Sequence, residues 1–192
     1  MTDKIKIYLA SPFFYYGGRC ETEFLATELE SAFGDRIELY VPHRNGDIND
    51  KSGNELKMVT GKDIARGDNR HLMGCDILIA NLDGSEIDSG VSAEIGYVAG
   101  YNSLIEDLGL DKKYIIGYTT DIRINKTSQA AIDAIKDGTV TGVDFVDNLK
   151  VNNLYKNLYT IGLVQMNGIY TVLHNGHEEI LEIVRDLLEH NF

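Results

Sequence analysis

Apolar positions along the chain form several short runs that are typical of strands. The first, Ile5–Ala10, alternates apolar and polar residues and then becomes continuously apolar. A shorter segment, Ile37–Val41, lies directly before Pro42. Two near-continuous apolar runs are expected for strands that are buried on both faces of a sheet: Asp76–Asn81 and Lys113–Tyr118.

A hairpin is predicted near the C-terminus. Two apolar segments, Ile161–Gln165 and Ile169–Leu173, flank the dipeptide Asn167-Gly168. Asn-Gly favours the tight turn that joins two antiparallel strands. We therefore expect these two segments to pair as a hairpin.

Segments with apolar residues at helical spacing lie between the strands: Glu21–Phe33, Asn54–Met73, Gly90–Leu104 and His177–Glu189. Strands that alternate with helices predict a parallel sheet with helices on both faces. The expected fold is α/β, flavodoxin-like or Rossmann-like, with a C-terminal hairpin and helix, and one domain spans residues 1–192. The polar region Asp121–Leu154 is expected to insert a helix and loops before the hairpin.

Charge and composition limit the classes of binding partner that we expect. The formal net charge of −12 repels phosphate backbones, so nucleic acid is not expected to bind. The N-terminal apolar run is too short for a signal peptide or a membrane span, so we expect a cytoplasmic protein without a membrane partner. Cys20 and Cys75 form no CxxC pair and are expected to be free thiols. The five histidines show no ligand spacing, so neither a metal site nor a catalytic histidine is expected.

Glu94 carries the strongest chemical signal. In a parallel sheet, ligands bind beyond the carboxyl ends of the strands, which places Glu94 close to the expected crevice. It lies near the start of the predicted helix, on the apolar stripe of Val91 and Val98. Burial there raises the pKa of a carboxylate, whereas a helix N-terminus favours the anion. An ionised, partly desolvated carboxylate suits nucleophilic attack on an anomeric carbon. The alternative is a charge that only stabilises the helix start.

Two other carboxylates and one glycine pair each allow two interpretations. Asp88 is either a helix N-cap or an acceptor for a sugar hydroxyl. Asp68 shares a helix face with Leu72 near the predicted C-terminal end of its helix, where the helix dipole disfavours the anion and raises the pKa. It is either a proton donor or an exposed residue without a catalytic role. Gly17-Gly18-Arg19 is either a phosphate cradle or a flexible loop, and the pattern favours the loop.

These segments together resemble the nucleoside 2-deoxyribosyltransferase family. The resemblance covers about residues 5–189, is weak over 121–154, and is most specific in the spacing of six residues between Asp88 and Glu94. Four stretches carry it: KIYLASPFF (Lys6–Phe14), DNRHLMGCDILIANLDG (Asp68–Gly84), DSGVSAEIGYVAG (Asp88–Gly100) and KNLYTIG (Lys156–Gly162).

The resemblance implies transfer of 2-deoxyribose between nucleobases by a retaining double displacement, with no metal and no organic cofactor. It makes Glu94 the nucleophile and Asp68 the proton donor to the departing base. Tyr8 would position the Glu94 carboxylate, and Asp88 would hold the 5′-hydroxyl of a deoxynucleoside.

The resemblance also implies contacts with the base and with other subunits. Phe13 and Phe14 would stack on the free or departing nucleobase, with Asn45 nearby. The family forms homo-oligomers, so a dimer or hexamer is expected. Asn157 would then reach the site of a neighbouring subunit.

Two other functions remain compatible with the sequence. A nucleoside 5′-monophosphate glycosidase would cleave the same bond and bind its phosphate at Gly17-Gly18-Arg19. Asp88 argues against it, because a carboxylate would repel that phosphate. The second is a domain that binds a nucleotide without catalysis, against which the set of Glu94, Asp68 and Asp88 argues.

Overall fold

A five-stranded parallel sheet forms the centre of the molecule. The computed structural model describes residues 4–46, 60–84, 86–121, 156–173 and 176–190. The strand order is β2-β1-β3-β4-β5, and each neighbouring pair is parallel. The predicted α/β class with a parallel sheet is therefore confirmed. The strands are β1 (Ile5–Ala10), β2 (Ile37–Tyr40), β3 (Ile77–Asn81), β4 (Tyr114–Thr119) and β5 (Gly168–Val172).

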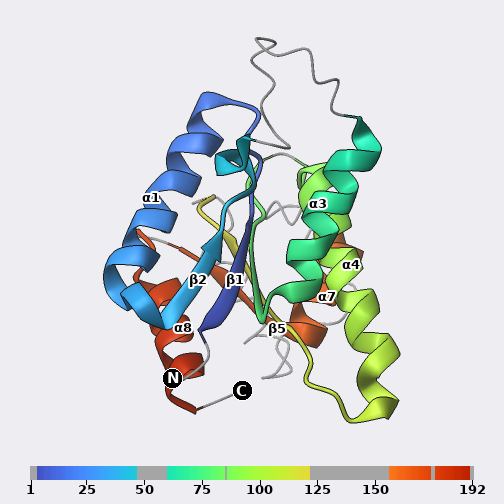
Figure 1. Ribbon diagram of the computed structural model, residues 1–192. Helices are drawn as coiled ribbons and strands as arrows, with labels where there is room; N and C mark the ends of the chain where they lie inside the picture. Colours follow the sequence, from blue (N-terminus) through green and yellow to red (C-terminus); the bar gives the residue numbers. More distant parts are fainter. Residues whose placement is uncertain (1–3, 47–59, 85, 122–155, 174–175, 191–192) are drawn as a thin grey trace, which may run out of the picture.

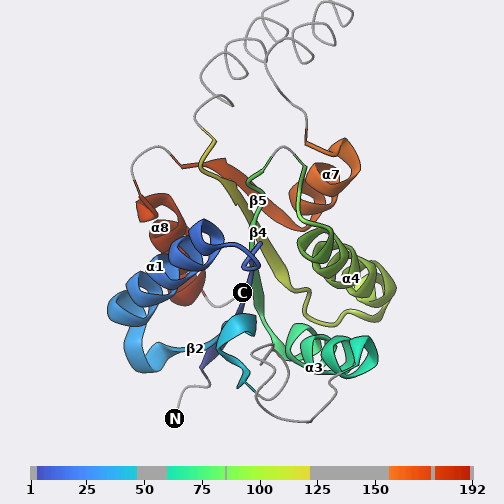
Figure 2. The same cartoon turned by 90° about the horizontal axis from the view of Figure 1, so that it is seen from above.

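Helices cover both faces of this sheet. In the described part of the chain, α1 (Tyr16–Phe33) and α8 (Glu178–His190) lie on one face (Figure 1, Figure 2). The other face is covered by α3 (Gly61–Gly74), α4 (Ser89–Ile105) and α7 (Leu158–Asn167). Short 3-10 turns follow α1, β2 and α4: η1 (Gly34–Arg36), η2 (Pro42–Arg44) and η3 (Glu106–Leu108). No helix in the described part of the chain is long and apolar enough to cross a bilayer.

Alternation along β1 assigns its side chains to two separate cores. Ile7 and Leu9 pack in the core beneath α1 and α8. Tyr8 and Ala10 point to the other side and pack in the core beneath α3, α4 and α7. Successive side chains of a strand point to opposite faces, so this register alone brings Tyr8 to the side on which α4 lies.

Polar side chains fix the starts of three helices. Thr60 and Asp63 form a reciprocal capping box at the start of α3. Asp88 caps α4, and its carboxylate accepts from the backbone N–H groups of Gly90 and Val91. Asn157 caps α7 in the same way. The first residues of the predicted helix over 54–73 lie outside the described residues, and so does most of the predicted insertion over 121–154.

The predicted C-terminal hairpin is wrong. Residues 161–165 belong to helix α7, with Ile161 and Val164 buried on one side, and β5 pairs parallel to β4. Asn167 ends the helix and is tied to α4, because Asn102 donates to its side-chain oxygen. Gly168 starts β5 where a Cβ would lie 2.0 Å from the Ile115 carbonyl oxygen. The glycine therefore serves a close approach between strands and not a tight turn.

Candidate active site

A short hydrogen bond between Tyr8 and Glu94 marks the candidate site. The Tyr8 hydroxyl donates to Oε1 of Glu94 over 2.6 Å. Tyr8 is fully buried in β1, and Glu94 is partly buried in the second turn of α4. Val91 and Val98 lie on the same face of α4 and are buried, so the carboxylate points toward the sheet.

Glu94 lies among other acidic groups. Burial raises the pKa of Glu94 to about 7. The negative charges of Asp68 and Asp88 add to this rise, and the hydrogen bond from Tyr8 opposes it. The carboxylate therefore exchanges its proton near neutral pH, where small changes in its surroundings alter its charge.

Tyr8 remains protonated, and so a hydrogen-bond donor, over the whole neutral range. Burial, followed by the charge of Glu94, raises the pKa of the Tyr8 hydroxyl above its usual range. An ionised carboxylate has no hydrogen to donate, so in its contact with ionised Glu94 the Tyr8 hydroxyl is the donor. Tyr8 therefore orients one oxygen of Glu94 and stabilises its ionised form.

Asp68 is also held by a tyrosine, which the sequence analysis did not identify. Tyr40, at the end of β2, donates to Oδ1 of Asp68 over 3.2 Å. Asp68 lies in the middle of α3 and not near its end, so the expected effect of the helix dipole does not apply to it. Tyr40 pairs in register with Tyr8, which places both hydroxyls on the same side of the sheet. The sequence does contain one sign of this role, because β1 and β2 each carry a tyrosine near the carboxyl end, and aligning the two strands would have paired them.

Asp88 performs the structural role that the sequence offered as one alternative. Its Oδ1 accepts from Gly90 N at 2.8 Å and from Val91 N at 3.1 Å. The same carboxylate contributes to the electrostatic potential at Glu94. A helix cap and a sugar contact are compatible, because a carboxylate has two oxygens with four acceptor positions.

The aromatic residues after β1 lie at the carboxyl end of the sheet. The rings of Phe13 and Phe14 are 4.8 Å apart, and Phe13 lies 5.6 Å from the ring of His43. Phe13 is partly buried, whereas Phe14 is 64% exposed. Asn45, just after η2, donates from Nδ2 to the Tyr40 hydroxyl over 3.2 Å. The structure thus brings Asn45 into the Tyr40–Asp68 group.

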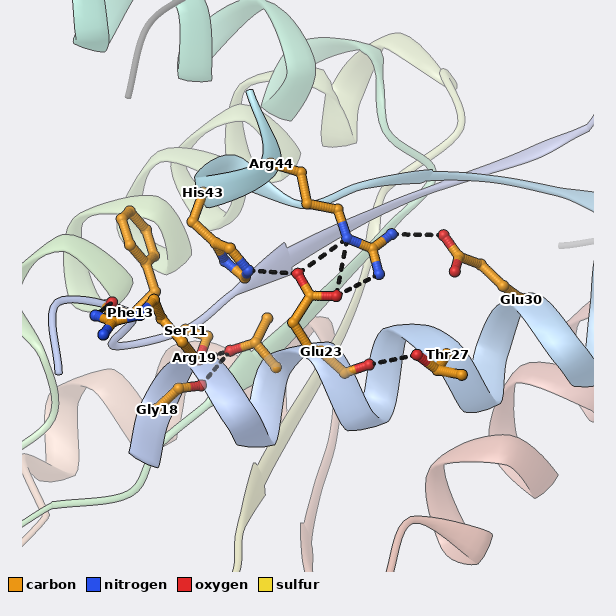
Figure 3. A network of polar contacts seen from close by, with 10 residues as sticks. Ser11, Phe13, Gly18, Arg19, Glu23, Thr27, Glu30, His43 and Arg44 are labelled. Atoms are coloured by element: carbon orange, nitrogen blue, oxygen red, sulfur yellow. Dashed lines mark hydrogen bonds and ion pairs between the residues drawn. The ribbon is translucent and has the colours of Figure 1, made fainter. Parts of the chain in front are cut away.

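The glycine pair belongs to a helix and not to a flexible loop. Gly17, Gly18 and Arg19 form the first turn of α1. A Cβ on Gly18 would lie 2.0 Å from the Pro12 carbonyl oxygen, so only glycine lets the loop after β1 lie against the helix. Arg19 donates to the carbonyl of Phe13 over 3.1 Å (Figure 3). These contacts hold the aromatic loop on α1.

The same helix holds the loop after β2. Glu23 accepts from both Nε and Nη2 of Arg44 and lies 2.6 Å from Nε2 of His43 (Figure 3). Glu30, two turns later, accepts from Nη1 of Arg44 over 2.6 Å. These contacts fix η2 and, with it, the position of Asn45, which directly follows η2. Helix α1 therefore supports both loops that border the candidate site.

Asn157 does not join this group. It is exposed, and its side-chain oxygen accepts from the backbone N–H groups of Tyr159 and Thr160. Both thiols are free, with Cys20 exposed and Cys75 buried. Across the ranges that the structure describes, no three histidine, cysteine, aspartate or glutamate side chains are arranged to hold a metal ion.

The fold and the site define an α/β protein with a cluster of carboxylates beside the carboxyl ends of its central parallel strands. A family model described as nucleoside 2-deoxyribosyltransferase matches residues 7–154. The chain therefore belongs to the nucleoside 2-deoxyribosyltransferase family.

Two solved structures are similar over nearly the whole chain. A conserved protein from Enterococcus faecalis V583 is 28% identical with a TM-score of 0.67, over 96% of this chain and 99% of that one. A 2-desoxiribosyltransferase from Leishmania mexicana shares the fold at 17% identity and a TM-score of 0.53, over 98% and 99% of the two chains. No curated protein sequence matches.

Proposed function

We propose that this protein transfers 2-deoxyribose between nucleobases through a covalent Glu94 intermediate. The observation that carries the proposal is the 2.6 Å hydrogen bond from Tyr8 to a carboxylate whose pKa is about 7. Retaining glycosyl transfer needs an ionised nucleophile and a separate proton donor. Glu94 and Asp68 form such a pair, because each is oriented by its own tyrosine.

In the first step, Asp68 donates a proton to a ring nitrogen of the departing base. The C1′–N bond breaks and its electron pair goes to the base. The Glu94 oxygen that is not bound to Tyr8 forms an ester bond with C1′. Tyr8 retains its hydrogen bond to Oε1, which holds the carboxylate in place for attack.

In the second step, an incoming base attacks C1′ from the side that the first base left. The C1′–O bond breaks, and its electrons return to the Glu94 carboxylate. The proton that the incoming nitrogen loses returns to Asp68. Two inversions give net retention at C1′, and water in place of the base would give hydrolysis.

Substrate contacts are assigned to residues around this pair. Phe13 and Phe14 stack on the base, because their rings lie together at the loop that α1 supports. Asp88 accepts from the 5′-hydroxyl of the sugar. A 5′-phosphate would meet this carboxylate, and Arg19 is already bonded to the Phe13 carbonyl. These contacts favour nucleosides over nucleoside 5′-monophosphates.

We also propose that the chain self-associates through α4 and α7. Helix α7 carries no charged residue, and Glu94 is the one charge in α4. A helix that is apolar on all sides is normally covered. Large apolar side chains nevertheless remain exposed along both helices: Tyr97, Leu104, Tyr159 and Met166. Asn157, at the start of α7, would then approach a neighbouring subunit, and a fully active monomer in sedimentation would contradict this assembly.

Base exchange tests the proposed activity directly. The protein is incubated with deoxyinosine and free adenine, and the products are separated. Deoxyadenosine is expected together with hypoxanthine. Hypoxanthine and free sugar without deoxyadenosine would instead identify a hydrolase, and binding without release of base would identify a sensor domain.

A further inference from the structure

Tyr40 has the same relation to Asp68 that Tyr8 has to Glu94. The two tyrosines are register partners on adjacent parallel strands, and their ring centroids are 5.1 Å apart. Each donates its hydroxyl hydrogen to a different carboxylate, Tyr8 to α4 and Tyr40 to α3. The pairing of β1 with β2 thus sets the separation of both donors at once.

The direction of the Tyr40 hydrogen bonds is fixed by Asn45. Nδ2 of Asn45 donates to the Tyr40 oxygen over 3.2 Å, and Tyr40 in turn donates to Oδ1 of Asp68 over 3.2 Å. A phenol has one hydrogen to donate, so an amide donor on its oxygen leaves that hydrogen for Asp68. The three side chains form a chain of donors that ends on one carboxylate oxygen.

The ring of Tyr40 is held as firmly as its hydroxyl. It stacks on His71 with centroids 3.6 Å apart and planes at 11°. His71 lies three residues after Asp68 in α3, so both side chains occupy one face of that helix. The stack and the hydrogen bond therefore fix Tyr40 to the same turn of α3. Burial is the main reason that the pKa of Tyr40 is raised to about 12, so its hydroxyl keeps its proton at neutral pH.

We propose that Tyr40 is a positioning residue that selects which oxygen of Asp68 delivers the proton to the departing base. Oδ1 accepts the Tyr40 hydrogen bond, and the carbonyl oxygen of a carboxylic acid is its better acceptor. The acidic proton therefore resides on Oδ2, which donates it to the base as the C1′–N bond breaks. This inference rests on the proposed function and adds the residue that orients its acid.

The test compares a base that needs a proton with one that does not. The base of 2′-deoxyadenosine leaves more readily when it is protonated, whereas 7-methyl-2′-deoxyguanosine already carries a positive charge and releases a neutral base. Tyr40→Phe keeps the ring and its stack on His71 and removes only the hydroxyl. We expect its kcat to fall about tenfold on 2′-deoxyadenosine and less than twofold on the methylated nucleoside, after subtraction of spontaneous release.

Controls separate this effect from loss of folded protein. The ratio of the two rates within one variant is independent of how much of that variant is folded. Asp68→Asn is expected to show the same selectivity with a larger loss. Tyr170→Phe removes a buried hydroxyl on the same sheet that has no hydrogen-bond partner among the described residues, so it should leave both rates unchanged. The pair 2′-deoxyuridine and 5-fluoro-2′-deoxyuridine extends the comparison to pyrimidines, since the fluorinated base is the better leaving group.

The outcomes separate the role of Tyr40 from the proposed transferase activity. Equal losses on the two members of a pair in Tyr40→Phe, or no loss on either, would overturn the role of Tyr40 while the transferase proposal stands. A wild-type protein that releases base from none of these nucleosides would overturn both.

Discussion

The Tyr8 hydroxyl lies 2.6 Å from Oε1 of Glu94, although 86 positions separate the two residues in the sequence. Parallel pairing of β1 with β3 and the packing of α4 on the same face bring them together. A neutral hydroxyl that donates to a carboxylate favours the charged form of that carboxylate.

Tyr8→Phe should change the pH at which Glu94 ionises. The hydrogen bond from Tyr8 lowers the pKa of Glu94, so its loss moves that pKa above about 7. Activity that requires the anion should then fall about tenfold to a hundredfold at pH 6.5, and the acidic limb of the kcat/KM profile should move to higher pH. Tyr118→Phe is the control, because Tyr118 is equally buried and bonds to Asn81. An unmoved limb in Tyr8→Phe would show that Tyr8 does not act through Glu94.

Glu94→Gln should stabilise the fold above neutral pH. The pKa of Glu94 rises from 4.5 to about 7 on folding. The contribution of protonated Glu94 to the free energy of unfolding is therefore complete below pH 4.5 and is lost as the pH rises through 7. A neutral glutamine avoids the loss. Urea unfolding at pH 8.5 should show a gain of at most about 3 kcal/mol, and little difference at pH 4. Equal stabilities at pH 8.5 would contradict the raised pKa.

Asp88→Ser separates the cap of α4 from contact with the sugar. Serine is a good N-cap, so the fold should retain nearly all of its stability, whereas Asp88→Ala should lose about 1 kcal/mol. With the negative charge removed, the preference for deoxynucleosides over their 5′-monophosphates should narrow or reverse. Competition between the two substrates measures this preference. A wild type that prefers the monophosphates would favour a 5′-monophosphate glycosidase.

His177 should stabilise the packing of α8 on α1 in a pH-dependent way. Its Nε2 lies 2.7 Å from Glu21, its Nδ1 lies 2.5 Å from Glu28, and its side chain is 2% exposed. Burial lowers the pKa of His177, but the hydrogen bonds and charges of the two glutamates more than offset it and raise the pKa above 6.5. The stabilisation is therefore complete below pH 6.5 and is lost as the pH rises through the raised pKa.

The matching variant is His177→Gln. It should lower the free energy of unfolding by about 2 kcal/mol at pH 6, and by less at pH 9. The kcat and KM of the folded variant should not change, because His177, Glu21 and Glu28 lie on the opposite face of the sheet from Glu94. A loss of stability that is the same at both pH values would exclude a charged His177.

The sequence predicted those parts of the fold whose signal is local. β1, β3 and β4 have apolar runs typical of buried strands, and their predicted boundaries agree with the structure to within one residue. The sequence predicts a strand where the structure has helix α7, because a short uncharged apolar segment has no distinguishing period. Asn167-Gly168 strengthened that error, since its role in joining α7 to β5 depends on contacts with Asn102 and Ile115 that sequence does not reveal.

The candidate site shows the same division. Glu94, Asp68 and Asp88 are predicted from residue type, spacing and resemblance, and the charges of Asp68 and Asp88 both raise the pKa of Glu94. Tyr40 was missed, because its importance comes from its register with Tyr8 and from the position of α3. Side chains that support a site through tertiary contacts have no local pattern by which they can be recognised.

Trapping of the sugar tests the central claim most directly. A 2-fluoro-2-deoxyarabinosyl nucleoside slows the second displacement, so a glycosyl ester should accumulate on the nucleophile. Mass spectrometry of a proteolytic digest is expected to show one sugar on the peptide that contains Glu94, and Glu94→Gln, which keeps the side-chain shape, should show none. An adduct on another residue, or full transferase activity in Glu94→Ala, would contradict the assignment of Glu94 as the nucleophile.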